Sequence, residues 1–375
     1  MQYAFQNESI GECDLAKNIS KLYTPLVFLL WFITTSAASH AAETSVVADI
    51  PFPWGVDHLD REHIIVTSKI GGVYIVSPGT KIITTIKNTP KVRVHRQGGL
   101  LDISVSTEKT RTYIYLCYSK PTAIGTAVAV HEARLINDEL QDGRDIYISN
   151  LESGSGVHFG CRLQIIGNEL FLSHGDRGQR HHAQDKTIDS GSIIRLVRTK
   201  KSEGAYAWSW NKEIFSIGHR NPQGLALNPR TGELWAHEHG PRGGDEINVI
   251  QSNANFGWPV ISYGEEYVGG SIGLDYSPEG FTDPIWKWIP SIAPSGMLFY
   301  TGEMFPELTK KVVVGSLKFG KIVALNLDTK YLPTNEFDWA VDLGRVRDLL
   351  ELEDGSLIVL LDERRNGVVR IHKPY

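Results

Sequence analysis

Short apolar runs alternate with polar turns along most of this 375-residue chain. Three stretches share one order: an apolar run, a turn, a second apolar run, a polar loop and a third apolar run. These stretches cover residues 162–197, 223–250 and 348–372, and a weaker version covers 100–135. Apolar runs joined by turns that contain Gly or Asn predict antiparallel hairpins. Each stretch is therefore predicted to form a small antiparallel sheet.

The spacing of these stretches predicts a six-bladed β-propeller. Helical periodicity is scarce, and many short strands at even spacing are typical of a sandwich, a barrel or a propeller. Blades of about 40–60 residues divide the chain after its N-terminal segment into roughly six units, a number found in propellers. No linker or low-complexity tract interrupts the chain, so a single all-β domain is expected. Strands are expected at Ile64–Ser68, Val73–Val76, Leu100–Val105, Thr112–Tyr118, Ala127–Leu135, Ser192–Val197, Glu246–Ile250, Met297–Tyr300, Val312–Leu317, Lys321–Leu327 and Gly367–His372.

The N-terminal segment has the pattern of a secretory signal peptide. Two lysines precede the apolar run Leu26–Ile33, and Ser39-His40-Ala41 fits the small-x-small cleavage rule. The apolar run is shorter than the roughly 20 residues that span a membrane, which argues against an uncleaved anchor. We expect a signal peptide over 1–41, a mature domain over 42–375 and export to the periplasm.

Composition excludes one class of partner and leaves one question about cysteine open. The net charge is −5, and no basic stripe is interleaved with aromatic residues, so nucleic acid is not expected as a partner. Two cysteines remain after the signal segment, Cys117 and Cys161, both in apolar strand-like contexts. An oxidising compartment allows a disulfide between them, but free cysteines are commonly just small buried side chains.

Polar residues stand where each predicted hairpin begins and ends. A hairpin brings its entry and exit together, so His158 is expected beside Asp176, and Arg345 near Asp362. A neutral His positioned by a carboxylate is a good proton acceptor, because the carboxylate sets the tautomer and stabilises the imidazolium. The alternative is a His158 ring that only satisfies a backbone carbonyl. Repetition around a ring would gather such residues at one mouth of the propeller.

Two further groups of residues indicate ligands. Lys318 follows an apolar run, Arg345 and Arg347 alternate before another, and with Arg220 they could bind carboxylates or phosphates. Ordinary surface charges paired with nearby carboxylates are the alternative. The Gly240-Pro241 loop, followed by acidic residues, suits a hard cation such as Ca²⁺, although a tight turn before a strand has the same pattern.

The longest ordered motif in the chain resembles that of a known family. Gly218-His219-Arg220-Asn221-Pro222-Gln223-Gly224-Leu225 leads through His239-Gly240-Pro241 and Asp245-Glu246-Ile247-Asn248 to Asn255-Phe256-Gly257-Trp258-Pro259. The motif is similar to that of the soluble quinoprotein sugar dehydrogenases of the glucose-sorbosone dehydrogenase family. These enzymes use pyrroloquinoline quinone (PQQ) and include periplasmic aldose sugar dehydrogenases. Matches elsewhere extend the resemblance over nearly all of the mature chain, and it implies a six-bladed β-propeller.

The resemblance implies catalytic and cofactor roles by position. The reaction would be oxidation of an aldose at C1 to a lactone, with hydride transfer to PQQ. His158 would be the general base, Asp176 the carboxylate that orients it, and Gln97 a contact to sugar and cofactor. Arg220 and Asn221 would lie beside the quinone oxygens, with Arg220 stabilising negative charge during reduction. The other implied cofactor contacts are Lys318, Arg345 and Arg347 on the carboxylates of PQQ, with Tyr267 and Trp288 lining its pocket.

The same resemblance implies two calcium sites and a substrate preference. The Gly240 and Pro241 carbonyls would hold the Ca²⁺ that polarises the quinone, a Lewis-acid role. Glu246 and the Phe256 carbonyl would form a second, structural site. Val157 departs from glucose dehydrogenase, which has an Asp there that contacts the sugar, and this favours broader aldose recognition. The implied partners are an aldose and an unidentified electron acceptor, with no stable membrane anchor, in a monomer or homodimer.

Two other functions also fit a propeller. A Ca²⁺-dependent hydrolase, such as a lactonase, would need a cage of Asn, Asp and Glu at the channel, whereas this mouth is predicted to be rich in cations. A binding module that has lost its cofactor would lack the base or the carboxylate clamp, and both are present in the sequence. We therefore expect a PQQ- and Ca²⁺-dependent aldose sugar dehydrogenase.

Overall fold

The structure is a computed structural model that describes residues 42–200 and 208–374. The signal peptide predicted over 1–41 lies outside the described residues. The described residues belong to one compact unit and are almost entirely β-strand and loop. Their helical content is two short 3₁₀ turns, Arg180–Gln184 and Pro306–Leu308. No helix in this part of the chain is long and apolar enough to cross a membrane.

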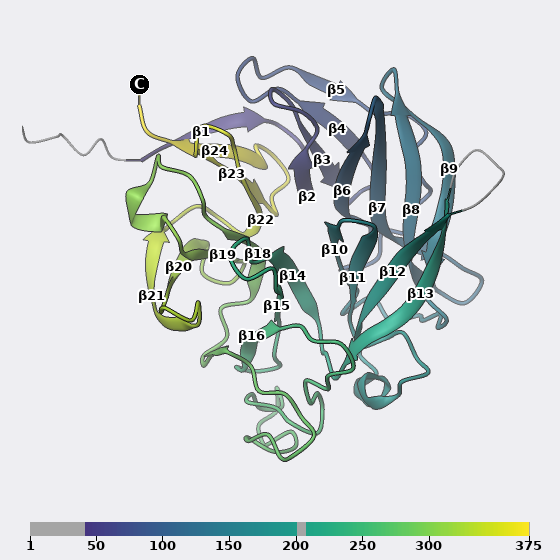
Figure 1. The fold of residues 1–375 in the computed structure, drawn as a ribbon, viewed down its shortest axis with the longest axis vertical. Helices are drawn as coiled ribbons and strands as arrows, with labels where there is room; N and C mark the ends of the chain where they lie inside the picture. The colour runs from purple at the N-terminus through teal and green to yellow at the C-terminus, as the bar shows by residue number, and fades with distance from the viewer. Residues whose placement is uncertain (1–41, 201–207, 375) are drawn as a thin grey trace, which may run out of the picture. The chain divides into compact units, whose positions relative to one another are not determined.

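The strands form six four-stranded antiparallel sheets, which are the blades of a propeller (Figure 1). The first three blades comprise β2 (Pro53–His58), β3 (Ile64–Ser68), β4 (Val73–Val76) and β5 (Ile83–Thr85); β6 (Leu100–Glu108), β7 (Arg111–Pro121), β8 (Thr126–Ile136) and β9 (Glu139–Ile148); and β10 (Gly160–Ile166), β11 (Glu169–His174), β12 (Ser192–Lys200) and β13 (Trp208–Ile217). The last three comprise β14 (Pro222–Leu227), β15 (Leu234–Glu238), β16 (Asp245–Val249) and β17 (Trp286–Trp288); β18 (Pro294–Phe299), β19 (Val312–Ser316), β20 (Lys321–Leu327) and β21 (Pro333–Ala340); and β22 (Val346–Glu351), β23 (Leu357–Leu361), β24 (Val368–His372) and β1 (Glu43–Ala48). The predicted all-β, six-bladed fold is confirmed.

The first strand of the chain closes the ring. β1 pairs with β24, with Glu43 opposite His372, so the sixth blade contains both the first and the last strand. The innermost strands β2, β6, β10, β14, β18 and β22 contact one another in sequence, and β22 contacts β2. Because the ring closes on itself, the loops that lead into these six strands meet at one mouth of the central channel.

Each innermost strand carries a β-bulge near its start. The pairing register shifts at corresponding places in all six strands, between Pro53 and Val56 in β2, for example, and between Gly160 and Leu163 in β10. A bulge adds a residue to one strand and changes the direction of the side chains beside it. Residues at the bulges can therefore point across the channel instead of into a blade.

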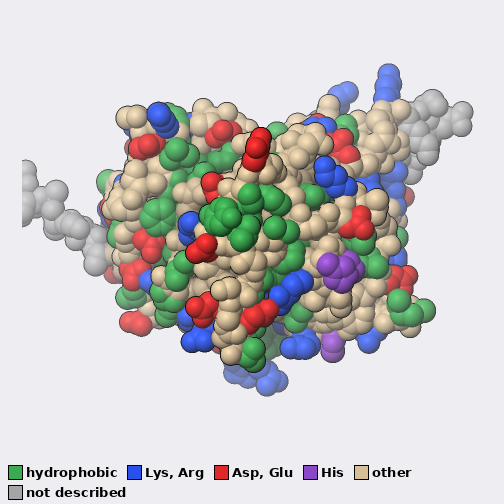
Figure 2. All heavy atoms as spheres, turned by 90° about the horizontal axis from the view of Figure 1, so that it is seen from below, with side chains coloured by type: hydrophobic (Ala, Val, Ile, Leu, Met, Phe, Trp, Pro, Cys, Tyr) green, Lys and Arg blue, Asp and Glu red, His purple; other side chains and the backbone are tan. Residues whose placement is uncertain are grey.

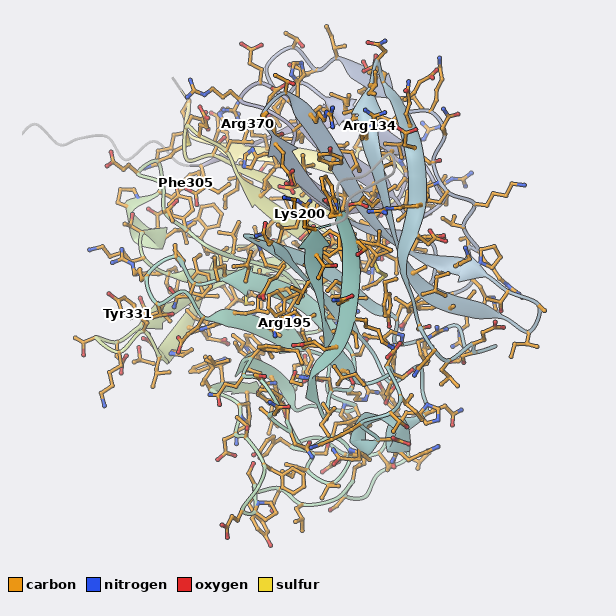
Figure 3. All side chains as sticks on the ribbon, turned by 45° about the vertical axis from the view of Figure 1, so that its right-hand side comes forward. Arg134, Arg195, Lys200, Phe305, Tyr331 and Arg370 are labelled. Atoms are coloured by element: carbon orange, nitrogen blue, oxygen red, sulfur yellow. A yellow bond between two sulfur atoms is a disulfide. The ribbon has the colours of Figure 1, made fainter. Side chains whose placement is uncertain are left out.

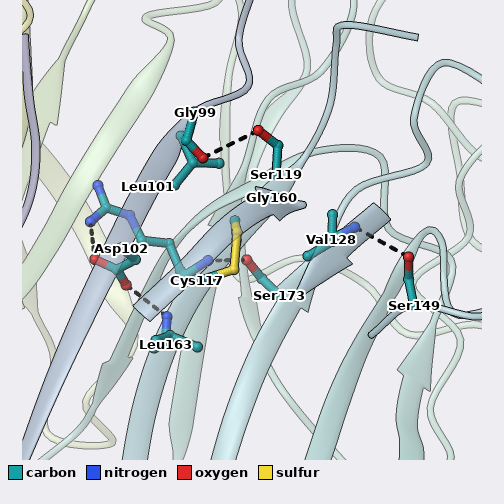
Figure 4. Close-up of a disulfide and its surroundings, with 12 residues drawn as sticks. Gly99, Leu101, Asp102, Cys117, Ser119, Val128, Ser149, Gly160, Leu163 and Ser173 are labelled. Carbon is teal, nitrogen blue, oxygen red and sulfur yellow. Dashed lines mark hydrogen bonds and ion pairs between the residues drawn. A yellow bond between two sulfur atoms is a disulfide. The ribbon is translucent and has the colours of Figure 1, made fainter. Parts of the chain in front are cut away.

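Apolar side chains fill the space between the blades (Figure 3). Phe305, labelled in Figure 3, packs edge-on against Trp339 with ring centroids 4.8 Å apart. A disulfide between Cys117 of β7 and Cys161 of β10 joins the second and third blades (Figure 4). The structure thus answers the question that the cysteine pattern left open.

Candidate active site

The predicted base lies beside its predicted carboxylate. His158 Nδ1 is 2.7 Å from Asp176 Oδ1. His158 precedes β10 and Asp176 follows β11, so pairing of these two strands brings the side chains together. The His158 ring is partly exposed, whereas the Asp176 carboxylate is buried. With Nδ1 donating its proton to the carboxylate, Nε2 can accept a proton from a ligand at the mouth.

Two further donors fix the Asp176 carboxylate. Oδ1 accepts the Gly178 N–H at 2.7 Å, and Oδ2 accepts the Trp258 Nε1–H at 2.8 Å. Burial acts to raise the pKa of Asp176, but the hydrogen bond and charge of His158 and the Gly178 N–H together hold it below its usual value. The carboxylate is therefore ionised at neutral pH and can stabilise an imidazolium. Trp258 belongs to the long motif of the chain, but its role could not be predicted from the sequence.

Gln97 lies on the other side of the base. Its Oε1 accepts the backbone N–H of His158 at 2.7 Å, and its own N–H donates to the Gly156 carbonyl at 3.0 Å. Gln97 thus positions the backbone that carries the base. Its side chain is exposed and lies next to the His158–Asp176 pair.

Arg220 and Asn221 enter the mouth from the fourth blade, immediately around the start of β14. Arg220 Nη1 donates to the carbonyls of His239 and Gly240, at 3.0 and 2.8 Å. The Asp176 N–H donates to the Arg220 carbonyl at 2.8 Å, which ties this loop to the His158–Asp176 pair. Asn221 is buried. Arg220 Nε is buried without a partner in residues 42–200 and 208–374, and an unsatisfied donor of this kind favours a polar or anionic ligand.

Four cations gather where the first, fifth and sixth blades meet the mouth. The Nη2 atoms of Arg345 and Arg347 lie 3.4 and 3.2 Å from Asp362 Oδ2, which confirms the predicted proximity of Arg345 and Asp362. Lys69, directly after β3, lies close enough for the charges of Asp362, Arg347 and Arg345 to act on its pKa. Lys318, shortly after β19, is exposed and donates to a backbone carbonyl. Lys69 was not among the predicted cofactor contacts, although it follows a strand just as Lys318 does.

One carboxylate does not balance these cations. Burial lowers the pKa of Arg347, and the nearby guanidinium groups of Arg162 and Arg345 add to this effect while Asp362 opposes it. Burial also lowers the pKa of Lys69. Arg347 Nε is buried and has no partner in the described part of the chain. The group therefore carries excess positive charge, and an anion with several carboxylates would neutralise it.

Arg162 closes the channel beyond the mouth. Its Nη1 donates to Asp348 Oδ2 at 2.7 Å and to Asp102 Oδ1 at 3.2 Å, and its Nη2 donates to the Arg347 carbonyl at 2.9 Å. The guanidinium also lies 4.4 Å from the centre of the Trp54 ring. Burial raises the pKa of Asp102 to about 7, although Arg162 opposes the shift. Most of these side chains come from the bulged segments, and they separate the mouth from a cavity of about 370 Å³ towards the far ends of the inner strands.

The four residues predicted to bind metal border one small space. Gly240, Pro241, Glu246 and Phe256 line a cavity of about 20 Å³ together with Glu238. A space of this size holds about one water-sized particle. Glu238 and Glu246 are cross-strand neighbours, and burial, followed by repulsion from Glu238, raises the pKa of Glu246 well above its usual range. Two carboxylates beside so small a space suit a hard cation.

One neighbouring atom favours a cation in this cavity, whereas others show that few side-chain ligands are available for it. Asn248 Oδ1 is buried without a partner in the described residues. The Gly240 carbonyl, however, already accepts a hydrogen bond from Arg220. The described residues contain no group of three or more His, Cys, Asp or Glu side chains placed to hold a metal, so backbone carbonyls would supply many of the ligands. Asp245, which sequence reasoning did not single out, holds this loop by accepting the Gly240 N–H at 2.9 Å.

Of the two residues expected to line the cofactor pocket, one lies in the apolar core and the other on an exposed loop. Trp288 is 3% exposed and packs in the core with Trp235 and Ile247, and its Nε1 donates to Glu336 Oε2 at 2.5 Å. Tyr267 is 71% exposed on the irregular segment between β16 and β17. This segment lies at the bottom of Figure 1, and Figure 2, seen from below, shows hydrophobic side chains gathered near the middle of that face.

A six-bladed propeller with a His–Asp pair and a group of cations at one mouth is compatible with an oxidoreductase, and comparison with known families shows which class it belongs to. The family described as Glucose / Sorbosone dehydrogenase matches residues 50–370. The chain belongs to this family, and it is a sugar dehydrogenase by class.

Individual relatives are similar along nearly the whole chain. Aldose sugar dehydrogenase YliI of Escherichia coli (strain K12) is 33% identical over 372 residues, which cover 92% of this chain and 97% of that protein. Quinoprotein glucose dehydrogenase B of Acinetobacter calcoaceticus is 28% identical, covering 84% of this chain and 83% of that protein. A crystal structure of the soluble aldose sugar dehydrogenase from Escherichia coli in the apo-form has a TM-score of 0.79 at 30% identity, covering 89% of this chain and 100% of that chain.

Proposed function

We propose that this protein oxidises aldose sugars at C1 to lactones, using PQQ and Ca²⁺, in the periplasm. The observation that carries the proposal is the 2.7 Å contact between His158 and Asp176 at the same mouth as an unbalanced group of cations. A base held by a carboxylate suits removal of a hydroxyl proton, and the cations suit a polyanionic cofactor. Membership of the sugar dehydrogenase family and the quinoprotein relative support the same assignment.

His158 performs the proton transfer in this proposal. Its Nε2 accepts the proton of the sugar C1 hydroxyl, while the C1 hydrogen leaves with the electron pair of its bond and the C1–O bond becomes a carbonyl. PQQ, when bound, supplies the two-electron acceptor for that hydride. Asp176 stabilises the imidazolium that forms on His158, and Trp258 keeps the carboxylate in place. Gln97 holds the His158 backbone and contacts the sugar.

Residues at the mouth could bind both the carboxylates of PQQ and the Ca²⁺ ion. Lys318, Arg345 and Arg347 would hold the carboxylates of PQQ, and we add Lys69 to this group. The unpartnered Nε of Arg220 would face the quinone with Asn221 beside it. The Gly240 and Pro241 carbonyls would hold the Ca²⁺ that polarises the quinone carbonyl. Glu246 and the Phe256 carbonyl would hold the second, structural ion, with the Glu238 carboxylate adjacent.

An oxidising compartment is supported by the covalent structure. Cys117 and Cys161 form a disulfide, and disulfides persist mainly in exported proteins. The signal-peptide pattern over 1–41 predicts the same destination. The physiological electron acceptor would then meet the enzyme in the periplasm.

Two substitutions separate catalysis from cofactor binding. His158→Ala should abolish turnover yet leave PQQ binding unchanged, because the base acts on the sugar. Arg345→Ala combined with Arg347→Ala should instead require far more PQQ to reach full activity. Arg195→Ala is the matched control, since Arg195 lies between Glu169 and Glu213 on the third blade, away from the cations of the mouth. A fully active His158→Ala enzyme, or an unchanged PQQ titration in the double variant, would contradict these roles.

A further inference from the structure

Two basic side chains cover the backbone that leads to the base. His95 and Arg96 precede the sugar contact Gln97 and lie across Gly156, which is buried beneath them. A Cβ atom on Gly156 would come within 2.6 Å of His95 Cδ2 and 2.9 Å of Arg96 Cδ. Gly156 stands two residues before His158, and two residues span at most about 7 Å. The Arg96 side chain therefore lies against the backbone that leads directly to His158.

The Arg96 guanidinium has no partner in residues 42–200 and 208–374. Other arginines of this face are paired: Arg180 Nη1 is 2.6 Å from Glu266, and Arg347 Nη2 is 3.2 Å from Asp362. Arg96 is exposed and makes no ion pair with a described carboxylate. Its neighbour His95 uses only its backbone, in a bridge to Gly98. A free guanidinium beside the substrate position is a ready donor for an anionic group.

The backbone at Arg96 adds a second, independent observation. Its φ is +53°, in the left-handed region that favours glycine. A long charged side chain at such a position costs conformational free energy, and strained residues of this kind cluster at binding sites. A glycine would make the same turn without strain but would bring no charge to the mouth.

We propose that Arg96, assisted by His95, binds the carboxylate of an acidic aldose, and that hexuronic acids are preferred substrates. The inference rests on the proposed function and specifies its substrate class. The chemistry at C1 is unchanged: the hydroxyl proton goes to His158 and the hydride to the quinone, while the distant carboxylate stays intact. Val157, beside the base, brings no carboxylate that would repel such a substrate.

The test compares matched pairs of sugars in the holoenzyme reconstituted with PQQ and Ca²⁺. The value of kcat/KM is measured for glucuronate against glucose and for galacturonate against galactose. The acid-to-neutral ratio should exceed one and should fall about tenfold or more in Arg96→Gln, because a charge-assisted contact is lost. Arg93→Ala is the control: it removes the same charge three residues away, where Nη1 donates to the Gly125 carbonyl, and should keep the ratio.

Binding without turnover gives a second readout. In the His158→Ala background, glucuronate should raise the melting temperature more than glucose does, and adding Arg96→Gln should remove this difference. High ionic strength should weaken the uronate effect, because exposed charges are screened. Arg96→Gly tests the backbone argument, since it should lose the preference for acids without lowering the melting temperature.

Each failure has a separate meaning. If no sugar of either kind is oxidised, the proposed function itself fails. If glucose is oxidised but the ratio is unchanged in Arg96→Gln, the substrate inference alone is overturned. A weaker PQQ titration in Arg96→Gln with an unchanged ratio would assign the guanidinium to the cofactor, and a large loss of stability in Arg96→Gly would make the side chain structural. Both of these results overturn the inference.

Discussion

Replacing Asp176 by Asn tests how the carboxylate supports the base. The substitution keeps the size of the side chain and removes its charge. If Oδ1 stays towards His158 and Gly178, the new NH₂ group faces the Trp258 Nε1–H, donor against donor. If the amide flips, its NH₂ group faces the Gly178 N–H and His158 Nδ1. His158 Nδ1 then has to accept a hydrogen bond, so the ring proton moves to Nε2. Either arrangement leaves the imidazolium without its counter-charge.

The size of the effect follows from the contact that is lost. A buried hydrogen bond to a charged group contributes roughly 1.5–3 kcal/mol, which corresponds to a fall in kcat of roughly 10- to 150-fold. If the tautomer changes as well, the loss approaches the whole contribution of a general base, roughly 10²–10⁴-fold. We expect Asp176→Asn to fall between these limits, with unchanged affinity for PQQ.

Dye reduction by the reconstituted variant measures this loss, and a second substitution separates charge from packing. Trp258→Phe removes the opposing N–H, so Asp176→Asn with Trp258→Phe should regain stability in urea unfolding but not activity. An Asp176→Asn enzyme with a kcat within about twofold of the parent would refute the assignment, because general-base catalysis that depends on a carboxylate cannot lose so little.

Three further predictions concern the scaffold. Replacing Cys117 and Cys161 by Ser should cost roughly 4 kcal/mol of unfolding free energy for a sequence separation of 44, and an unchanged melting temperature would contradict the disulfide. Burial, helped by Arg177, lowers the pKa of His174 from 6.5 to about 4, so the unfolded chain takes up the proton first. The free energy of unfolding should therefore fall by up to roughly 3 kcal/mol as pH drops from 6.5 towards 4. In urea titrations, His174→Gln should reduce this dependence on pH, and an unchanged dependence in the variant would contradict the role of His174. Arg162→Met leaves the Asp102 and Asp348 carboxylates unpaired and should cost roughly 3–5 kcal/mol by the same assay, whereas a neutral effect would show that Arg162 does not stabilise the channel.

Local pairing explains which parts of the site could be predicted from the sequence. The contact between His158 and Asp176 depends on one hairpin, and the proximity of Arg345 to Asp362 depends on another. In each case the turn and the two apolar runs are contiguous in the chain. Pairing of neighbouring strands is enough to place such residues, so no knowledge of the whole ring was needed.

Contacts across the ring could not be predicted in this way. Trp258 reaches Asp176 from 82 residues away, and Arg162 meets Asp348 from 186 residues away. Arg162 lies at a bulge, where one additional residue changes the direction of the side chain. The alternation of apolar and polar residues does not reveal a bulge. These contacts therefore appear only when all six blades are assembled.

Outer strands were missed for a different reason. β21 (Pro333–Ala340) has no fully buried residue and many polar ones, and β5 has three residues that are mostly exposed. Neither strand has the apolar run on which strand prediction relies. β1 pairs with β24 across the full length of the domain, so no local pattern indicates its partner. By contrast, three strands match their predicted bounds: Ile64–Ser68, Val73–Val76 and Lys321–Leu327. The first is fully buried, and the third is buried over its middle residues.

Dye reduction by the purified protein tests the central claim most directly. The protein, freed of cofactor and treated with a chelator, is assayed with a panel of neutral and acidic aldoses, with PQQ and Ca²⁺ added separately and together. The account predicts activity only when both are present, and its loss in His158→Ala. Failure to bind PQQ at all, or equal activity without it, would contradict the account.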